Sequence, residues 1–153
     1  MRAAFGALLV FAWWAPAQTG PTQESGAVMS TIHQFVDAFN KGDVKTAAAA
    51  CAAQTSIIDE FPPHEWHGTG ACAKWMKDYD LDAKKLEITD GIVTLGEVRH
   101  LDVASGLAYV VIPADYGYKM GGKPVKETGS TLTLVLRKSA SGWHITGWSW
   151  SKN

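Results

Sequence analysis

The sequence predicts an α+β fold in which N-terminal helices cover one face of a single curved antiparallel sheet. Apolar residues recur at helical spacing as far as Tyr79, whereas apolar and polar residues alternate after Lys85. The 153 residues are 46% hydrophobic and 19% charged, which is the composition of one globular domain with a core. Helices that precede a run of strands favour separate layers of helix and sheet.

The first residues have the features of a secretory signal. Arg2 supplies a positive start, an apolar run follows to Trp14, and Ala15-Pro16-Ala17 is a small-x-small cleavage site. About a dozen apolar residues are too few to span a bilayer as a helix. We therefore expect a signal peptide at 1–17, a flexible leader at 18–26, and an exported domain at 27–153, in the periplasm or outside the cell.

The charges are balanced and scattered. The chain has 14 Lys and Arg residues against 15 Asp and Glu residues, a formal net charge of −1, and no basic patch. Nucleic acids and anionic membrane surfaces attract clustered positive charge, so neither is an expected partner of the domain after signal removal.

A first helix is predicted from about Ala27 to Gly42. Its apolar stripe consists of Val28, Ile32, Phe35, Val36 and Phe39. Gly42 is a natural C-terminal stop, and Asp43 can cap a second short helix through "VKTAAAACAA", because alanine loses little entropy in a helix.

A first strand is predicted over Thr55 to Phe61, followed by a break. Side chains alternate between the two faces of a strand, so Ile57, Asp59 and Phe61 share one face and Glu60 lies on the other. Pro62-Pro63 cannot donate ladder hydrogen bonds, so we expect a loop to about Gly68. Thr69 then caps a third helix whose apolar stripe comprises Cys72, Trp75, Met76 and Tyr79.

The remaining chain reads as strands. They are "LEIT", "IVTLGEVRHLDV", "LAYVVIPADYGYKM", "KETGSTLTLVLRK" and "WHITGWSW", separated by turn residues at Asp90-Gly91, Ser105-Gly106, Gly121-Gly122 and Ser141-Gly142. The only two cysteines, Cys51 and Cys72, lie in alanine-rich segments predicted to be helical. Export permits a disulfide between them, and two free buried thiols fit the pattern equally well.

Four motifs, in this order, resemble the nuclear transport factor 2-like superfamily, which includes ketosteroid isomerase and the SnoaL-like polyketide cyclases. They are "FVDAFNKGD", "TSIIDEF", "WHGTGACAKWM" and "GWHITGWSWS". The resemblance covers the chain after Ala27. It implies a cone-shaped, cystatin-like fold in which a bent sheet wraps around the long helix, a pocket at the open end, and a homodimer through the exposed sheet face.

The resemblance also implies a general base. In the isomerase this base is an aspartate on the first strand, in a pattern like T-x-x-D, and Asp59 falls on that position. Apolar neighbours on its strand face would disfavour the charged form and raise the pKa of Asp59 into the range useful for proton transfer.

The oxyanion donors of the isomerase are not matched. Phe35 stands where the isomerase has a tyrosine, and Leu134 lies nearest the place of its protonated aspartate. Replacement donors are available on Tyr79, Tyr116, Tyr118, Trp148 and Trp150 if these side chains reach the pocket.

The candidate catalytic residues are Asp59 and His64, and His64 would modulate the charge of Asp59. The candidate pocket residues are Phe35, Phe61, Trp66, Trp75, Tyr79, Tyr116 and Trp148, with core packing as the alternative role for the tryptophans. "HEWH" lacks the histidine spacing of a zinc helix, so no metal and no cofactor are predicted.

These observations lead to one expected function and one alternative. The expectation is an exported SnoaL-like domain that binds a small apolar organic molecule, with proton transfer next to a carbonyl group by Asp59. The alternative is a non-catalytic domain that binds a ligand or forms a dimer, because one fold can host unrelated functions.

Overall fold

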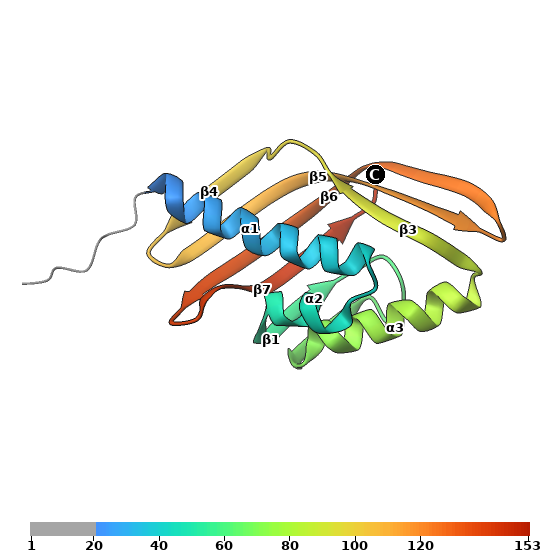
Figure 1. The fold of residues 1–153 in the computed structure, drawn as a ribbon, viewed down its shortest axis with the longest axis horizontal. Coiled ribbons are helices and arrows are strands. Elements are labelled where there is room, and N and C mark those ends of the chain that lie inside the picture. The colour runs from blue at the N-terminus through green and yellow to red at the C-terminus, as the bar shows by residue number, and fades with distance from the viewer. Residues whose placement is uncertain (1–20) are drawn as a thin grey trace, which may run out of the picture.

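A computed structural model describes residues 21–153 of the chain, as three helices and one mixed sheet. The helices are α1 (Pro21–Asn40), α2 (Val44–Ala50) and α3 (Ala71–Lys85). The strands are β1 (Cys51–Ile58), β2 (Glu65–Thr69), β3 (Ile88–Leu95), β4 (His100–Ala104), β5 (Leu107–Met120), β6 (Lys123–Ser139) and β7 (Gly142–Ser151). Figure 1 shows α1 lying across the strands, with α2 and α3 following it.

Within residues 21–153 the sheet has the order β2-β1-β7-β6-β5-β3, with β4 also paired to β5. All pairs are antiparallel except β1 with β7, which run parallel. The predicted α+β fold is confirmed, but the purely antiparallel sheet is corrected to a mixed one. β1 comes early in the described chain and β7 is its last strand, so no tight turn joins the two and they can run parallel.

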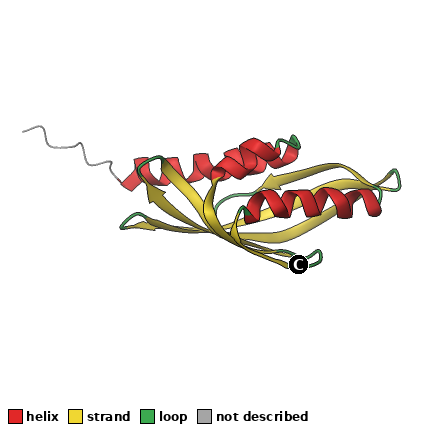
Figure 2. Ribbon diagram, turned by 90° about the horizontal axis from the view of Figure 1, so that it is seen from below, coloured by secondary structure: helices red, strands yellow, loops and turns green. Residues whose placement is uncertain are grey.

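The core lies between α1 and the inner face of the long strands. Val28 and Ile32 of α1 are fully buried, as are Ile112 of β5, Leu134 of β6 and Ile145 of β7. The predicted apolar stripe of the first helix therefore faces the sheet. Register irregularities between Ala114 and Tyr116 and between Val135 and Leu136 interrupt the long ladders. Such bulges bend strands, and the strands curve around the helices in Figure 2.

The N-terminal boundaries differ in part from the sequence expectation. The helix α1 begins at Pro21, six residues before Ala27, so residues 21–26 of the expected leader are helical. The expected signal peptide at 1–17 and the rest of the leader lie outside the described residues. None of the helices between residues 21 and 153 combines the length and the apolar character that crossing a membrane requires.

Four other details of the predicted elements are corrected. The helix α2 stops at Ala50, because Cys51 already pairs with Ile145 on β7. The predicted loop to Gly68 contains β2, which pairs with β1 through Ile57 and Trp66, and Gly70, not Thr69, is the N-cap of α3. The predicted turn at Asp90-Gly91 is an irregularity within β3, where the pairing with β5 shifts register between Thr89 and Ile92.

The two cysteines form a disulfide. Cys51 at the start of β1 is bonded to Cys72 in the first turn of α3, across 21 residues of chain, and both residues are buried. The bond decides between the two alternatives that the sequence left open, and it fastens α3 to the edge of the sheet.

We predict that replacing both cysteines by alanine lowers the free energy of unfolding by about 3 kcal/mol, because a crosslink of this length restricts the unfolded chain. Urea denaturation of the two proteins measures the difference. A reducing agent should destabilise the natural chain and leave the double variant unchanged. Equal midpoints of the oxidised natural chain and the double variant would contradict the prediction.

Candidate functional site

A cavity of about 380 Å³ lies between the helices and the bent sheet. Its walls come from α1, α3, β3, β5, β6, β7 and the β1–β2 connection. Six of the seven predicted pocket residues line it, namely Phe35, Phe61, Trp75, Tyr79, Tyr116 and Trp148. Asp59, the predicted base, lines it as well.

Aromatic rings in mutual contact form much of the cavity wall. The Trp75 ring lies edge-on to Trp148, with centroids 4.7 Å apart, and 5.3 Å from the ring of Phe39. Phe35 bridges Trp75 and Trp148 at 6.0 and 5.8 Å. Rings at these distances attract one another beyond their burial, so the wall is preorganised around Trp75.

Asp59 projects a carboxylate into this aromatic surrounding from the end of β1. Its Oδ2 accepts a hydrogen bond from Trp75 Nε1 at 2.7 Å, and its Oδ1 accepts one from the Glu60 backbone N–H at 2.7 Å. Burial disfavours the charged carboxylate and raises the pKa of Asp59 from 3.8 to about 6, although both hydrogen bonds oppose the rise. At neutral pH this carboxylate is ionised but readily protonated.

Two predicted site residues lie outside the cavity. His64 is exposed and its Nδ1 lies 3.2 Å from the backbone oxygen of Asp59, and its charge lowers the pKa of Asp59 as the smallest of the causes that act on that carboxylate. Trp66 is buried beneath the Phe61 ring, at a centroid distance of 5.0 Å, and donates its N–H to Asp78 at 2.8 Å. Core packing, the alternative role given to the tryptophans, describes Trp66.

Two tyrosine hydroxyls meet in the cavity wall. The Tyr79 and Tyr116 hydroxyls hydrogen-bond to each other, and burial raises the pKa of both. Both groups therefore stay protonated at neutral pH, and because one hydroxyl donates to the other, the second keeps its proton for another acceptor. Gly91 makes room for them, because a Cβ on this residue would lie 2.5 Å from the Tyr116 hydroxyl. The β3 irregularity at Asp90-Gly91 thus accommodates the tyrosine pair.

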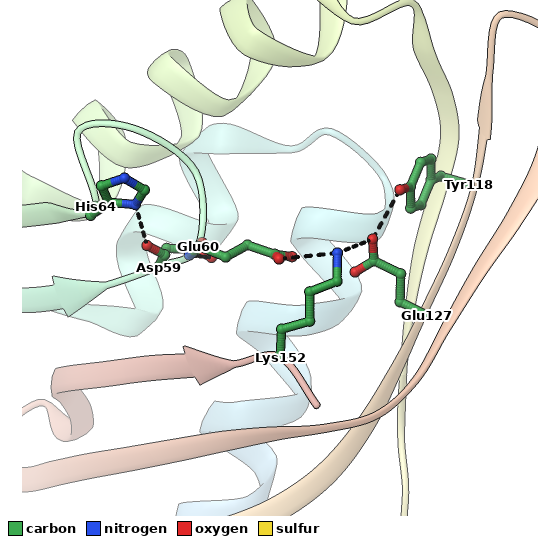
Figure 3. A network of polar contacts seen from close by, with 6 residues as sticks. All are labelled: Asp59, Glu60, His64, Tyr118, Glu127 and Lys152. Carbon is green, nitrogen blue, oxygen red and sulfur yellow. Dashed lines mark hydrogen bonds and ion pairs between the residues drawn. The ribbon is translucent and has the colours of Figure 1, made fainter.

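A polar group that the sequence did not predict lies at one side of the cavity (Figure 3). Lys152 Nζ lies 2.6 Å from Glu127 Oε1 and 3.3 Å from Glu60 Oε2, and the Tyr118 hydroxyl donates to the same Glu127 oxygen at 2.9 Å. All four side chains line the cavity. Glu60 was expected on the opposite face, but β1 ends at Ile58 and the strand alternation stops before Glu60.

The position of Lys152 could have been predicted from the sequence, but that of Glu127 could not. Lys152 continues the two-residue period of Trp148 and Trp150 along β7 and past its end. Glu127 breaks the period set by Leu132 and Leu134. The reason is an extra residue in β6, since Ala114 pairs with Ser130 and Tyr116 pairs with Glu127, with Gly129 at a φ of +78° between them.

Among residues 21–153, no group of His, Cys, Asp and Glu side chains is arranged to hold a metal ion. The cavity wall offers carboxylates and hydroxyls, but they come from separate elements and are engaged with Trp75, Lys152 and one another.

The family model of the SnoaL-like domain matches residues 28–152. The chain belongs to the SnoaL-like domain family. A comparison with curated proteins gives no match.

Solved structures similar to this SnoaL-like domain share the nuclear transport factor 2-like fold. One is a ketosteroid isomerase-like protein from Erwinia carotovora atroseptica, with a TM-score of 0.67, 19% identity, and coverage of 85% of this chain and 96% of that one. A nuclear transport factor 2-like superfamily protein from Salmonella enterica has a TM-score of 0.73 and 14% identity, and the match covers 87% of this chain and 93% of that one. A protein with a cystatin-like fold from Novosphingobium aromaticivorans has a TM-score of 0.68 and 12% identity, and the match covers 84% of this chain and 82% of that one.

Apolar side chains occupy the two positions at which the sequence predicted no oxyanion donor. Phe35 lines the cavity without a donor, and Leu134 is fully buried in the core beside the cavity-lining Leu132. Trp148 Nε1 and Glu127 Oε2 are two of the three buried side-chain polar atoms that have no hydrogen-bond partner among the described residues. Both belong to residues of the cavity wall.

The raised pKa of Asp59 predicts a pH-dependent stability difference. A folded-state pKa above the unfolded value favours folding below about pH 4, and this contribution is lost as the pH rises through about 6. We therefore expect Asp59→Asn, which keeps an acceptor for Trp75, to gain roughly 2 kcal/mol relative to the natural chain between pH 4 and pH 7.

Urea denaturation at both pH values measures this difference. The variant's gain should be complete near pH 7 and flat above it. A difference in stability that is the same at pH 4 and pH 7 would contradict the raised pKa.

Proposed function

We propose that this SnoaL-like domain binds a small, largely apolar carbonyl compound in the cavity and moves a proton at the carbon next to the carbonyl, with Asp59 as the base. The single observation that carries the proposal is the Asp59 carboxylate, which lines an aromatic cavity and has a pKa raised to about 6. A base of this pKa is mostly ionised at neutral pH and returns its proton easily.

The proton transfer needs a base and a place for negative charge. Asp59 takes the proton, the electrons of the C–H bond form the carbon–carbon double bond of an enolate, and the charge moves to the carbonyl oxygen. Where the ketone is β,γ-unsaturated the product is a dienolate, and protonated Asp59 returns the proton to its γ carbon, so the double bond moves into conjugation with the carbonyl group without a co-reactant.

The hydroxyl pair of Tyr79 and Tyr116 is the donor best suited to the enolate oxygen. Both residues line the cavity, and both hydroxyls are protonated at neutral pH because burial raises their pKa. The negative charge of Asp59 raises the pKa of Tyr79 further. Hydrogen-bond donors fixed in a cavity of low polarity stabilise developing charge more than water does. The pair has one free O–H and would supply one donor in place of those missing at Phe35 and Leu134.

We also propose that the domain works after export. The disulfide between Cys51 and Cys72 supports this, because structural disulfides persist in oxidising compartments and are rare in the cytosol. The charged-apolar-small pattern of residues 1–17 points the same way.

A second candidate is a ligand-binding domain without catalysis. Both Asp59 oxygens already accept hydrogen bonds, from Trp75 and from the Glu60 backbone, so the carboxylate could serve as a polar anchor in the wall. The absence of a donor on Phe35 favours this candidate. Substrate turnover by the natural chain separates the two.

We predict that Asp59→Asn lowers kcat/KM for isomerisation of a β,γ-unsaturated ketone by a factor of about 10² to 10⁴, the usual contribution of a general base. The change in ultraviolet absorbance on conjugation measures the rate. The natural chain should show a rate that rises with pH and levels off above about 6, following the pKa of Asp59.

The matched control is Asp82→Asn, which removes another carboxylate of the cavity wall, from α3, and should retain turnover. Ligand affinity measured by calorimetry should persist in Asp59→Asn. Turnover that survives Asp59→Asn would exclude the catalytic role, and a bound ligand without turnover by the natural chain would leave the second candidate.

A homodimer through the outer face of the sheet is compatible with either candidate, and we propose it for this chain. Tyr109 of β5 and Val135 of β6 are cross-strand partners on the face opposite the core, exposed by 45% and 42%. Exposed apolar neighbours on a sheet are typical of an interface. Light scattering at micromolar concentration should give twice the monomer mass, and Val135→Lys should shift it to the monomer. A monomeric natural chain would remove this proposal.

A further inference from the structure

The charges around the cavity are unequal. Its lining contains four carboxylates, Asp59, Glu60, Asp82 and Glu127, and one cationic side chain, Lys152. With all five ionised, the lining carries a formal charge of −3, while the whole chain carries −1. A concave surface with walls of low polarity focuses such a field on whatever enters it.

The Glu127 carboxylate is largely buried, and only one of its two oxygens has hydrogen-bond partners. Its side chain is 12% exposed, and its Oε1 receives both the Lys152 ammonium and the Tyr118 hydroxyl. Its Oε2 is buried and has no hydrogen-bond partner among the described residues. A buried carboxylate oxygen without a donor is costly, so Glu127 retains the capacity to accept a further hydrogen bond.

The side of the cavity formed by Glu60 and Glu127 already binds a positive charge, the ammonium of Lys152. Its ammonium lies between the carboxylates of Glu60 and Glu127, as Figure 3 shows, and the hydrogen bond to Glu127 raises the pKa of Lys152. Its side chain is 50% exposed and follows the last residue of β7. A lysine at the end of a strand can swing into solvent at small cost, because half of it is already hydrated.

We propose that the cavity selects organic cations, so that its ligand has an apolar body and a protonated amine that takes the place of the Lys152 ammonium between Glu60 and Glu127. This selectivity rests on the proposed ligand-binding function of the cavity. The ammonium supplies three donors, two for the oxygens that now hold Lys152 and one for the unpartnered Glu127 oxygen.

The walls favour the same ligand. The cavity is lined by the faces and edges of nine aromatic residues, among them Trp75, Trp148 and Trp150. An organic cation is attracted by aromatic faces when it is partly desolvated. A carboxylate ligand would instead meet four carboxylates and one cationic side chain, Lys152, which Glu60 and Glu127 already hold, and this is unfavourable.

Three probes with one apolar body test the selectivity. They are 2-naphthylmethylamine, 2-naphthalenemethanol and 2-naphthoate, titrated calorimetrically into the oxidised natural chain at pH 7.5 and low salt. We expect the amine to bind at least about tenfold more tightly than the alcohol, and the carboxylate more weakly than both. Equal affinities would overturn the selectivity and leave the cavity's ligand-binding function standing. Absence of binding by all three probes would overturn both.

Variants locate the selectivity within the lining. Glu127→Gln and Glu60→Gln keep the shape of the side chains and should each lower the amine-to-alcohol preference by about tenfold, since each removes a charged acceptor. Lys152→Met removes the competing ammonium and should tighten amine binding without changing alcohol binding. Two glutamate variants keep the test decisive if one fails to fold.

The matched control is Glu97→Gln, which removes the same charge from an exposed position outside the cavity lining. It should leave the preference unchanged. An equal loss of preference in the control would mean that overall charge, and not the cavity, selects the amine. Weaker amine binding by Lys152→Met would show that Lys152 supports the ligand and would overturn the proposed exchange of ammonium groups.

Discussion

The hydrogen bond from the Trp75 indole to the Asp59 carboxylate is the contact on which the candidate site depends. It favours the charged form of a carboxylate at the wall of an aromatic cavity, where burial disfavours that form. The same contact joins α3 to the end of β1, while the disulfide of Cys72 joins α3 to the start of that strand. With Cys72 and Trp75 one turn apart on the helix, both ends of β1 are fastened to a single helical face.

Local patterns in the sequence were sufficient for much of the fold. The α1 stripe at Val28 and Ile32 is buried against the sheet, and alternation along the strand placed Ile57 and Asp59 on the inner face. The sequence did not predict the parallel pairing of β1 with β7, because pairing between strands distant in the chain leaves no mark on local periodicity. The predicted second helix was also too long, because pairing with β7 from Cys51 onward overrides the helix preference of the alanines after Ala50.

The aromatic wall of the candidate site and Asp59 were predicted from the sequence, whereas the charged group of Glu60, Glu127 and Lys152 was missed. Aromatic residues such as Trp75 and Tyr79 can be predicted from their helical spacing within one segment. Glu60, Glu127 and Lys152 come from three separate parts of the chain, so no local spacing links them. The two glutamates reach the cavity because β1 ends at Ile58 and because β6 has an extra residue near Gly129. Both are departures from regular alternation, so a pattern that assumes regular strands places these carboxylates outside the cavity, whereas Lys152 continues the period of β7 past its end.

The central claim is that Asp59 is a desolvated carboxylate held in its charged form by Trp75. Carbon-13 NMR titration of the Asp59 carboxyl carbon in the oxidised chain tests it most directly, with Trp75→Phe as the paired protein. The account predicts a pKa near 6 in the natural chain, and a higher one in the variant because the hydrogen bond that favours the charged form is lost. A pKa near 4 in both proteins would mean that water reaches this carboxylate freely, which would contradict the account.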